Sequence, residues 1–593
     1  MEYLGLNHNK YLQAIPSHNN IEPNSQPKNI CPNYAPVSDH MEVLSIPYNN
    51  YLQENTLNDY SLGDIHFWSS SNINHTSILV PNTYTQAMQS KQSIEWRAAM
   101  DNEIISLEEK NTWELVELPP GFDIEVLGTK WVFKVNIDPS GNIRFKARFV
   151  VQGFNQRPGI NFLDTYAPTP TLTSIRILIN IAIQEGLLCH HCDVNNAYLN
   201  ADIDFDVYVK QPEGYIQGPN LVCKLNKALY GLKQAAFRWH TTIVNFMLSI
   251  GLKQSVMDPC VYVRRTRSST LIILIWVDDL LIAASDVKTL NDFKKCFSSS
   301  FQIKDLGELN WFLGIQFKIT PTYISLNQSF YTQSIINRFK MSEAKPRTLP
   351  CDPSVYDLLR EPSEYLQNPT PFRELVGSLI YLMTATRPDL AFIVTLLSRF
   401  MQTPTKMQYK IGLGILQYLK HTLHYELRYV RMEEPLQITI FSDSDWASDL
   451  DFQSISGYLC KLNKNSAAIS WRSGKQTLVA ASSCESEYKA LFHAISEGIF
   501  LRQLLAEFLN LPPMIVLVYG DNVGSITLAK HPAYHRKSRH INIKYHFIRK
   551  YVRNKSVILA YIPSRQNLAD MATKPLKGPN IRNFASIRGI SSD

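Results

Sequence analysis

The stretch LIILIWVDDLLIAA occupies residues 271–284 and decides the fold of the region around it. Residues 271–276 and 280–284 are apolar runs of β-forming side chains, and they flank Val277, Asp278 and Asp279. Short apolar runs on either side of a turn predict a buried hairpin, here with two carboxylates at its tip. A carboxylate beside buried strands is costly unless it is paired or binds a cation. The pair alone is weak evidence for a metal site, because turns favour aspartate for backbone reasons.

A third aspartate, Asp193, ends an apolar approach in the stretch CDVNNAYL of residues 192–199. Mg²⁺ prefers oxygen ligands and keeps coordination positions open for phosphates. Two such ions can activate a primer 3′-hydroxyl and stabilise a leaving pyrophosphate. Asp193, Asp278 and Asp279 could form such a site, but the residues alone leave ordinary turn aspartates open as the alternative.

A second acidic set lies in the C-terminal third of the chain. Its members stand at predicted strand ends, at a helix start and in the stretch NLADMATKPL: Asp443, Glu487, Asp521 and Asp570. Four such carboxylates can hold two Mg²⁺ ions across a scissile phosphate, so that water attacks in line. Each residue is ordinary alone, since acidic residues are common at these places. Glu485 is a rival for the glutamate role, but the apolar face of the predicted helix favours Glu487.

Composition limits the class of protein. The chain has 593 residues, of which 45% are hydrophobic, and this is enough for several domains. Its formal net charge of +7 permits a nucleic-acid partner without requiring one. We see no secretory signal and no apolar run long enough for a membrane, and nine cysteines in this length suggest reduced thiols. These features predict an intracellular protein that does not enter a membrane.

Two further patterns have ordinary alternatives. The run Cys189-His190-His191-Cys192 could supply half a zinc site, but no second CxxC pair occurs, so we expect ordinary thiols and histidines. Residues 530–555 are rich in lysine and arginine with interspersed aromatic residues. This stretch could be a solvated face or a surface that binds the backbone of a hybrid duplex, and the sequence leaves both open.

The region from Tyr84 to Leu576 resembles the reverse transcriptase and ribonuclease H region of copia-type long-terminal-repeat retrotransposon Pol polyproteins. Matching stretches stand in the family's order: GTKWVFKVNIDPSGNIRFKARFVVQGF, CDVNNAYLNADI, CKLNKALYGLKQAAFRW, WVDDLLIA, DLGELNWFLGI, FSDSDWASD, SSCESEY, YGDN and IPSRQNLADMATKPL. The resemblance implies RNA- and DNA-templated DNA synthesis and cleavage of RNA in RNA–DNA hybrids. It also implies two Mg²⁺ ions per active site, with Mn²⁺ as a possible substitute. The implied partners are an RNA template, a DNA primer, the hybrid and deoxynucleoside triphosphates.

The resemblance assigns roles residue by residue. It implies a catalytic, metal-binding set for DNA synthesis (Asp193, Asp278 and Asp279) and a second one for RNA cleavage (Asp443, Glu487, Asp521 and Asp570). It implies a nucleotide-binding set: Lys146, Arg148, Tyr198, Gly231 and Gln234. It implies a primer-binding set: Trp276, Trp311, Phe312, Leu313 and Gly314. Tyr198 matches a steric gate against a ribose 2′-hydroxyl, with a core tyrosine as the alternative. Trp276 stands where the family usually has tyrosine, which puts rate and fidelity in doubt but not metal binding.

The expected fold is an α+β right-hand polymerase (fingers, palm and thumb) followed by an α/β ribonuclease H-like domain. We predict six segments: a disordered or linker segment 1–75, a helical N-terminal extension 76–125, fingers and palm 126–345, thumb or connection 346–435, a ribonuclease H-like domain 436–577 and a C-terminal tail 578–593. Residues 1–75 could be the tail of a longer polyprotein, because no protease or integrase is visible. The expected location is the cytoplasm, in a virus-like particle, with the nucleus as a second site. The oligomeric state is not predicted.

Two rival interpretations predict other residues than those present. An inactivated remnant that only binds nucleic acid would not need its carboxylates, yet all the matched positions keep them. An integrase would carry a His-His-Cys-Cys zinc module and a differently spaced acidic triad, and neither is visible in the sequence.

Overall fold

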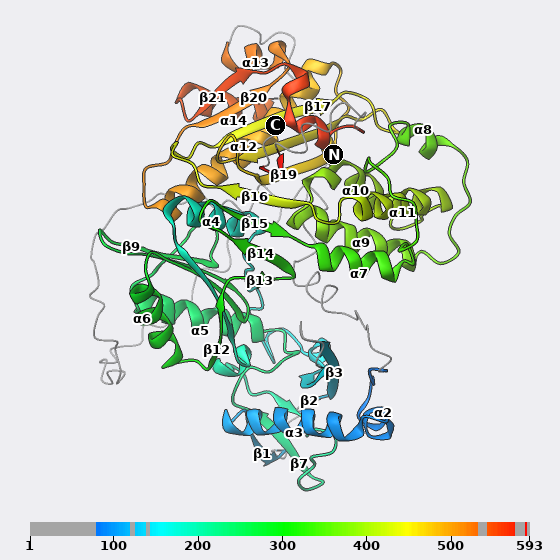
Figure 1. Cartoon of the computed structure of the whole chain (residues 1–593). Helices are drawn as coiled ribbons and strands as arrows, with labels where there is room; N and C mark the ends of the chain where they lie inside the picture. The colour runs from blue at the N-terminus through cyan, green and yellow to red at the C-terminus, as the bar shows by residue number, and fades with distance from the viewer. Residues whose placement is uncertain (1–78, 119–124, 138–142, 532–541, 576–586, 590–593) are drawn as a thin grey trace, which may run out of the picture.

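The computed structural model describes residues 79–118, 125–137, 143–531, 542–575 and 587–589. The predicted linker 1–75 lies outside the described residues, as does most of the predicted tail 578–593. The described residues form five β-sheets, which follow one another from the N-terminal elements at the bottom of Figure 1 to the C-terminal elements at its top. Among the described residues, no helix has the length and apolar content that crossing a membrane requires.

The N-terminal region combines two helices, a four-stranded sheet of order β1-β7-β6-β2 and a two-stranded hairpin. Its elements are α2 (Tyr84–Gln89), α3 (Ser93–Glu109), β1 (Trp113–Glu117), β2 (Val126–Leu127), β3 (Thr129–Ile137), β4 (Ile143–Val151), β6 (Tyr208–Val209) and β7 (Leu221–Leu225). Trp96 of α3 packs edge-on against Phe133 and Phe145 of the hairpin, with ring centroids 5.2 and 4.6 Å apart. These aromatic contacts fix the β3–β4 hairpin against α3.

Residues 76–125 differ from the predicted helical extension. The helices α2 and α3 are present, but β1 pairs along its whole length with β7, from Trp113 opposite Leu225 to Glu117 opposite Leu221. The segment is therefore an integral part of the N-terminal sheet. Its strand could not be recognised locally, because its pairing partner lies about a hundred residues further along the chain.

A six-stranded sheet, the palm sheet, follows with the order β12-β5-β11-β10-β9-β8. Its strands are β5 (Leu188–Val194), β8 (Lys253–Gln254), β9 (Val261–Arg265), β10 (Thr270–Trp276), β11 (Asp279–Ala284) and β12 (Ile303–Glu308). Helices α4 (Leu172–Glu185), α5 (Ala235–Ser249) and α6 (Val287–Ser298) accompany it. The predicted hairpin is present as β10 and β11, with Trp276 opposite Asp279.

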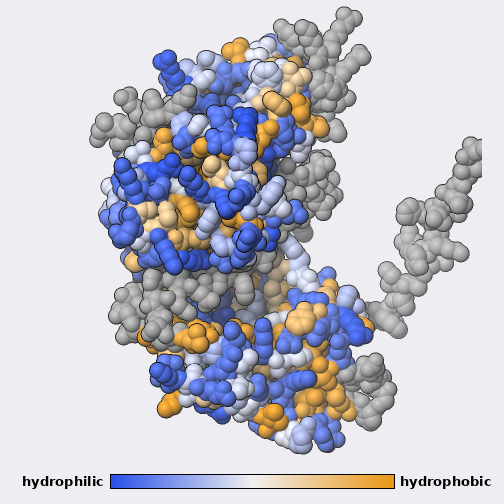
Figure 2. All heavy atoms as spheres, turned by 90° about the vertical axis from the view of Figure 1, so that its right-hand side faces the viewer, coloured by the Kyte–Doolittle hydropathy of each residue, from blue (hydrophilic) through white to orange (hydrophobic). Residues whose placement is uncertain are grey.

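The next region consists of a four-stranded sheet and a group of helices. The sheet runs β13 (Trp311–Phe312), β14 (Ile315–Ile319), β15 (Tyr323–Asn327) and β16 (Glu426–Val430). The helices are α7 (Ser329–Arg338), α8 (Val355–Arg360), α9 (Thr370–Ala385), α10 (Ala391–Ser398) and α11 (Lys406–His421). Figure 2 looks onto the side where α8 and α11 lie in Figure 1, and its surface is mainly hydrophilic with scattered hydrophobic patches.

A five-stranded sheet near the C-terminus, the C-terminal sheet, has the order β19-β18-β17-β20-β21. Its strands are β17 (Thr439–Asp445), β18 (Ile455–Lys461), β19 (Ala468–Lys475), β20 (Val516–Gly520) and β21 (Val557–Tyr561). The helices are α12 (Ser483–Leu509), α13 (Val523–Lys530) and α14 (Asn542–Arg553). The first two pairings of the order are antiparallel and the last two parallel, so the sheet is mixed.

One hydrophobic core joins the palm sheet to the C-terminal sheet. Ile177 and Ile181 of α4 belong to the same buried cluster as Leu501 and Leu505 of α12. Arg176 of α4 is buried there and donates hydrogen bonds to three carbonyl oxygens: Ile469 (2.7 Å), Thr384 (2.8 Å) and Ala385 (3.0 Å). These acceptors lie on β19 and α9, so one side chain ties together three parts of the chain.

Candidate active sites

The palm aspartates meet at the tip of the β10–β11 hairpin. Asp279 begins β11 directly opposite Asp193 of β5, and Asp278 lies in the preceding turn, where its carbonyl oxygen accepts a hydrogen bond from the Val194 N–H at 2.7 Å. Val277 has a φ of +56°, a costly conformation for a β-branched residue. Its carbonyl oxygen accepts a hydrogen bond from Trp239 Nε1 at 2.6 Å, which helps to hold the turn. The three predicted residues are thus brought together on adjacent strands.

The electrostatics of this group suit a cation. Partial burial, together with the charges of Asp278 and Asp279, raises the pKa of Asp193 to about 6, and Lys146 opposes the shift. Carboxylates that repel one another at a strand edge are the oxygen donors that Mg²⁺ accepts. The residues therefore fit a divalent metal.

His191, to which the sequence assigned no role, contacts this group. Its Nε2 lies 2.7 Å from Oδ1 of Asp279, and its ring packs edge-on against Phe312 at 5.2 Å. In the Cys189–Cys192 run of β5, successive side chains point to opposite faces of the sheet, so the four do not converge on one point. His190 instead lies 2.9 Å from Lys294 Nζ. The prediction of ordinary thiols and histidines fits this arrangement, except that His191 holds a candidate metal ligand.

Three residues of the predicted nucleotide-binding set converge beside the aspartates. Arg148 of β4 lies over the Tyr230 ring at 4.7 Å, and this ring contacts Tyr198 with centroids 4.8 Å apart. Partial desolvation and the Arg148 charge lower the pKa of Lys146, whereas Asp193 and other nearby carboxylates raise it. Burial and the Asp278 charge raise the pKa of Tyr198 to about 12. The β3–β4 hairpin thus brings positive charge to the open side of the palm carboxylates.

Gly231 and Gln234 have structural contacts instead. Gly231 has a φ of +92°, and a Cβ there would lie 2.1 Å from the carbonyl oxygen of Val151. Gln234 is buried, accepts a hydrogen bond from Gln156 Nε2 at 2.9 Å and donates one to the Asn161 carbonyl oxygen at 2.9 Å. Gly231 therefore lies against the end of β4, and Gln234 is held between Gln156 and Asn161 of the segment that follows β4.

The predicted primer-binding residues divide by exposure. Trp311 is 41% exposed, whereas Phe312 is fully buried and Trp276 is 3% exposed. Leu313 and Gly314 form the tight β13–β14 turn with positive φ angles of 50° and 73°, and the Tyr381 hydroxyl of α9 donates to the Leu313 carbonyl oxygen. Among these residues, Trp311 and the half-buried turn at Leu313 and Gly314 therefore offer a primer the most accessible surface.

Three residues of the second acidic set form a compact group. One ligand atom from each of Asp443, Glu487 and Asp521 lies within 4.8 Å of the others. They come from β17, the first turns of α12 and the residue after β20. Glu485, the rival to Glu487, instead pairs with Lys489 at 2.9 Å and accepts a hydrogen bond from the Ala481 N–H. The structure therefore places Glu487, as preferred from the sequence, in the group.

Burial makes this group a strong candidate for cation binding. Desolvation raises the pKa of Asp443 to about 7, with Lys574 opposing the rise. Desolvation and the charges of Asp443 and Asp521 raise the pKa of Glu487 to about 9. The buried oxygen atoms fit one or more hard cations such as Mg²⁺.

Asp570 is not one of these three residues, but its carboxyl adjoins that of Asp443. It lies in the short 3₁₀ helix η8 (Leu568–Ala572), and its Oδ1 is 2.9 Å from Lys574 Nζ. Burial raises the pKa of Asp570, while Lys574 opposes the shift. The Thr573 hydroxyl, next to Lys574, donates to Oδ2 of Asp443. No pattern in the sequence singles out Lys574 or Thr573.

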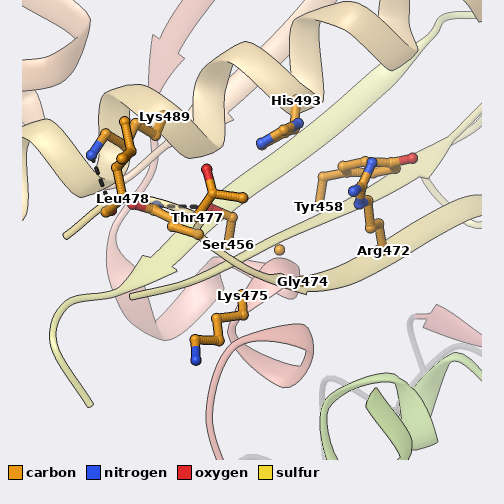
Figure 3. A pocket seen from close by; sticks show the side chains of 11 residues that line it. Ser456, Tyr458, Arg472, Gly474, Lys475, Thr477, Leu478, Lys489 and His493 are labelled. Atoms are coloured by element: carbon orange, nitrogen blue, oxygen red, sulfur yellow. Dashed lines mark hydrogen bonds between the residues drawn. The ribbon is translucent and has the colours of Figure 1, made fainter. Parts of the chain in front are cut away.

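A small pocket of about 60 Å³ lies between β18, β19 and α12. Figure 3 shows His493 of α12 facing Tyr458 and Arg472, with Thr477 next to Ser456 at the other end of the pocket. Gln476, which also lines it, donates to the Ser486 carbonyl oxygen at 2.9 Å, one residue before Glu487. The pocket is thus next to the C-terminal carboxylates and carries cationic side chains.

The predicted basic stretch 530–555 is partly described, since residues 532–541 lie outside the described residues. On α14, His546 and Lys550 are exposed and line a hollow with Arg553. Arg549 is buried and donates to the Leu528 carbonyl oxygen at 3.1 Å. The basic charge of α14 is therefore divided between a surface and a structural contact.

Comparison with known proteins defines the class. Residues 110–353 match the family model described as "Reverse transcriptase (RNA-dependent DNA polymerase)". This range contains the whole palm sheet, its three aspartates and the β3–β4 hairpin. The chain therefore contains a reverse transcriptase domain.

More specific relatives identify the family. The retrovirus-related Pol polyprotein from transposon RE1 of Arabidopsis thaliana is 39% identical over 519 residues, which is 86% of this chain and 34% of that protein. The transposon Ty5-1 protein of Saccharomyces cerevisiae is 31% identical over 51% of this chain and 99% of its own length. The chain belongs to the family of copia-type retrotransposon Pol polyproteins. It spans about a third of the length of the RE1 polyprotein.

A solved structure of the foamy viral protease–reverse transcriptase in complex with an RNA/DNA hybrid is also similar. The TM-score is 0.46 at 14% identity, and the likeness covers 81% of this chain and 55% of that one. So distant a likeness carries no argument about this site.

Proposed function

We propose that the chain is an RNA-directed DNA polymerase that copies RNA and DNA templates from a DNA primer and also cleaves the RNA strand of RNA–DNA hybrids. The polymerase proposal depends on one observation: Asp193 and Asp279 face each other across β5 and β11, with Asp278 beside them and Lys146 and Arg148 nearby. The nuclease proposal depends on the convergence of the second acidic group.

In the polymerase site, Asp193, Asp278 and Asp279 would hold two Mg²⁺ ions, with Mn²⁺ as a possible substitute. When bound, the metal lowers the pKa of the primer hydroxyl and neutralises charge on the leaving pyrophosphate. Lys146 and Arg148 would bind the phosphates of a deoxynucleoside triphosphate.

Tyr198, packed on Tyr230, would lie beneath the sugar and leave no room for a 2′-hydroxyl. Among the predicted primer-binding residues, Trp311 and the β13–β14 turn would support the primer terminus, because the side chains of Phe312 and Trp276 are buried. These residues bind and orient the substrates, and the aspartates bring the reacting groups into line.

In the second site, Asp443, Glu487 and Asp521 would hold a divalent cation at the scissile phosphate of the RNA strand, with Asp570 at its side. The exposed basic residues of α14 would bind the backbone of the hybrid. We further propose an intracellular location, in cytoplasmic virus-like particles and in the nucleus, in accord with membership of the family.

A paired assay tests both activities on the full chain. Asp278→Asn with Asp279→Asn keeps side-chain size while removing charge, and we expect it to reduce primer extension at least about 100-fold and spare hybrid cleavage. Asp443→Asn should have the reverse effect. Asp164→Asn, at an exposed position, is the matched control and should leave both activities unchanged. Parental extension by the double variant would refute the polymerase site, and parental cleavage by the Asp443 variant would refute the nuclease site.

A further inference from the structure

A lysine side chain lies inside the C-terminal acidic set. The ammonium of Lys574 is 2.9 Å from Oδ1 of Asp570 and 3.9 Å from Oδ2 of Asp443. Its side chain is 35% exposed, whereas both carboxylates are almost fully buried. The ammonium therefore lies at the solvent side of the two acids and bridges them.

The backbone that carries Lys574 is fixed to the sheet. Asn567 Nδ2 donates to the Ser442 carbonyl oxygen of β17 at 2.9 Å, and the Thr573 hydroxyl donates to Asp443. Residues 567–574, which we call the strap, also lie close to β18. A Cβ at Gly457 of β18 would be 2.8 Å from Cβ of Ala572 and from Cγ2 of Thr573. Hydrogen bonds of Asn567 and Thr573, on either side of η8, therefore fix the backbone that places Lys574 at the carboxylates.

The acidic set makes two kinds of contact. Asp443, Glu487 and Asp521 converge within 4.8 Å, while Asp570 adjoins both Lys574 and Asp443. Asp443 takes part in both kinds of contact. Its Oδ2 accepts a hydrogen bond from the Thr573 hydroxyl and lies 3.9 Å from the Lys574 ammonium. One of its oxygen atoms is therefore engaged by the strap.

We propose that Lys574 is a resident cation of the nuclease site, whose ammonium neutralises Asp570 and one oxygen of Asp443. A first divalent ion would then bind the group of Asp443, Glu487 and Asp521. A second ion would bind only by displacing the ammonium. This inference rests on the proposed ribonuclease H function for its biological meaning, but it concerns the carboxylates themselves. Lys574 is a positioning residue, since it acts through the acids.

The physical argument is one of charge. Carboxylates that ionise in a mostly buried site repel one another, and a fixed positive charge beside Asp443 and Asp570 reduces this repulsion without any bound ion. The same charge repels a divalent ion brought next to it. Lys574 should therefore stabilise the metal-free site and weaken the binding of the second ion.

The test uses the full chain with Asp278→Asn and Asp279→Asn, which removes the polymerase site as a source of bound ions. Mn²⁺ binding is measured by electron paramagnetic resonance in this background and with Lys574→Gln or Lys574→Arg added. We expect one tightly bound ion in the background and in Lys574→Arg, which keeps the charge. In Lys574→Gln we expect a second ion to bind at least about tenfold more tightly than in the background. An unchanged number and affinity of ions in Lys574→Gln would overturn the inference.

A stability measurement separates this role from a merely structural one. In EDTA, Lys574→Gln should lower the thermal unfolding midpoint, because the carboxylates lose their counter-charge, and saturating Mn²⁺ should restore it. If Lys574 only packs the strap, Mn²⁺ will not restore the midpoint. If Lys574→Gln does not fold in EDTA, recovery of folding on adding Mn²⁺ counts for the inference and its absence counts against it.

The outcomes remain distinct from those of the proposed function. Absence of hybrid cleavage in the parental chain would refute the nuclease, yet the Mn²⁺ stoichiometry would still decide the role of Lys574. Conversely, a parental nuclease whose ion binding ignores Lys574 would refute only the present inference.

Discussion

Replacing Arg176 by methionine should destabilise the whole chain. Burial lowers the pKa of Arg176 to about 10, so the guanidinium stays charged at neutral pH. Methionine is of similar length but donates no hydrogen bonds. It would leave the carbonyl oxygens of Ile469, Thr384 and Ala385 without this donor, and it would remove the contact of the guanidinium with the Trp471 ring at 4.2 Å.

The size of the effect follows from these contacts. Each lost hydrogen bond to a charged donor costs about 1.5–3 kcal/mol, and relief from burying the guanidinium offsets part of the sum. We expect a net loss of about 3–5 kcal/mol in the free energy of unfolding. Because the acceptors lie on different parts of the chain, the polymerase and nuclease activities should lose heat resistance together.

Urea unfolding followed by tryptophan fluorescence measures the loss, and the half-lives of primer extension and hybrid cleavage at elevated temperature measure the coupling. Arg267→Met, at an exposed position between β9 and β10, is the matched control and should change neither. A change below about 0.5 kcal/mol in Arg176→Met would refute the reasoning, because such a change is typical of surface positions. Faster inactivation of one activity alone would refute the coupling.

Three further outcomes are expected. Tyr198→Ala should lower discrimination against ribonucleotides by about tenfold or more in single-nucleotide incorporation, and unchanged discrimination would leave Tyr198 a core residue. In the folded chain the pKa of Asp193 is raised to about 6, so the stability of the metal-free protein falls as the pH rises from about 4 to 6. Asp193→Asn should therefore stabilise the chain in EDTA by about 1–2 kcal/mol at pH 7.5 and by less at pH 5. Equal unfolding midpoints of variant and parent at pH 7.5 would contradict this. Gly231→Ala should cost more than about 3 kcal/mol in urea unfolding, because its Cβ would overlap the Val151 carbonyl oxygen, and a parental midpoint would exclude that overlap.

The palm hairpin could be predicted from the sequence because its information is local. Two runs of β-branched and aliphatic side chains around a short turn leave few alternatives to paired strands, and β10 and β11 begin and end within two residues of the predicted runs. The long helix of the C-terminal unit was similarly visible from its apolar face. In both elements the pattern repeats within a few residues, so no distant partner is needed to recognise it.

Other residues could not be placed because their roles depend on distant partners. In the sequence, Arg176 is a single charged residue in an apolar helix. Its hydrogen bonds to carbonyl oxygens of β19 and α9 explain why it is buried. His191 alternates with its neighbours in a strand, and its pairing with Asp279 depends on the β5–β11 register. The resemblance implied a nucleotide contact for Gln234, but its side-chain partners lie in a segment some seventy residues earlier in the chain.

The core shared by α4 and α12 has a consequence for how the two proposed activities would work along one duplex. Since packed side chains connect the palm sheet to the C-terminal sheet, the two catalytic centres cannot swing independently, as they could on a flexible tether. A duplex that left the polymerase centre would reach the nuclease centre after a constant number of base pairs. The first RNA cuts would then trail the growing DNA end at one fixed offset, so that the protein body would act as a molecular ruler.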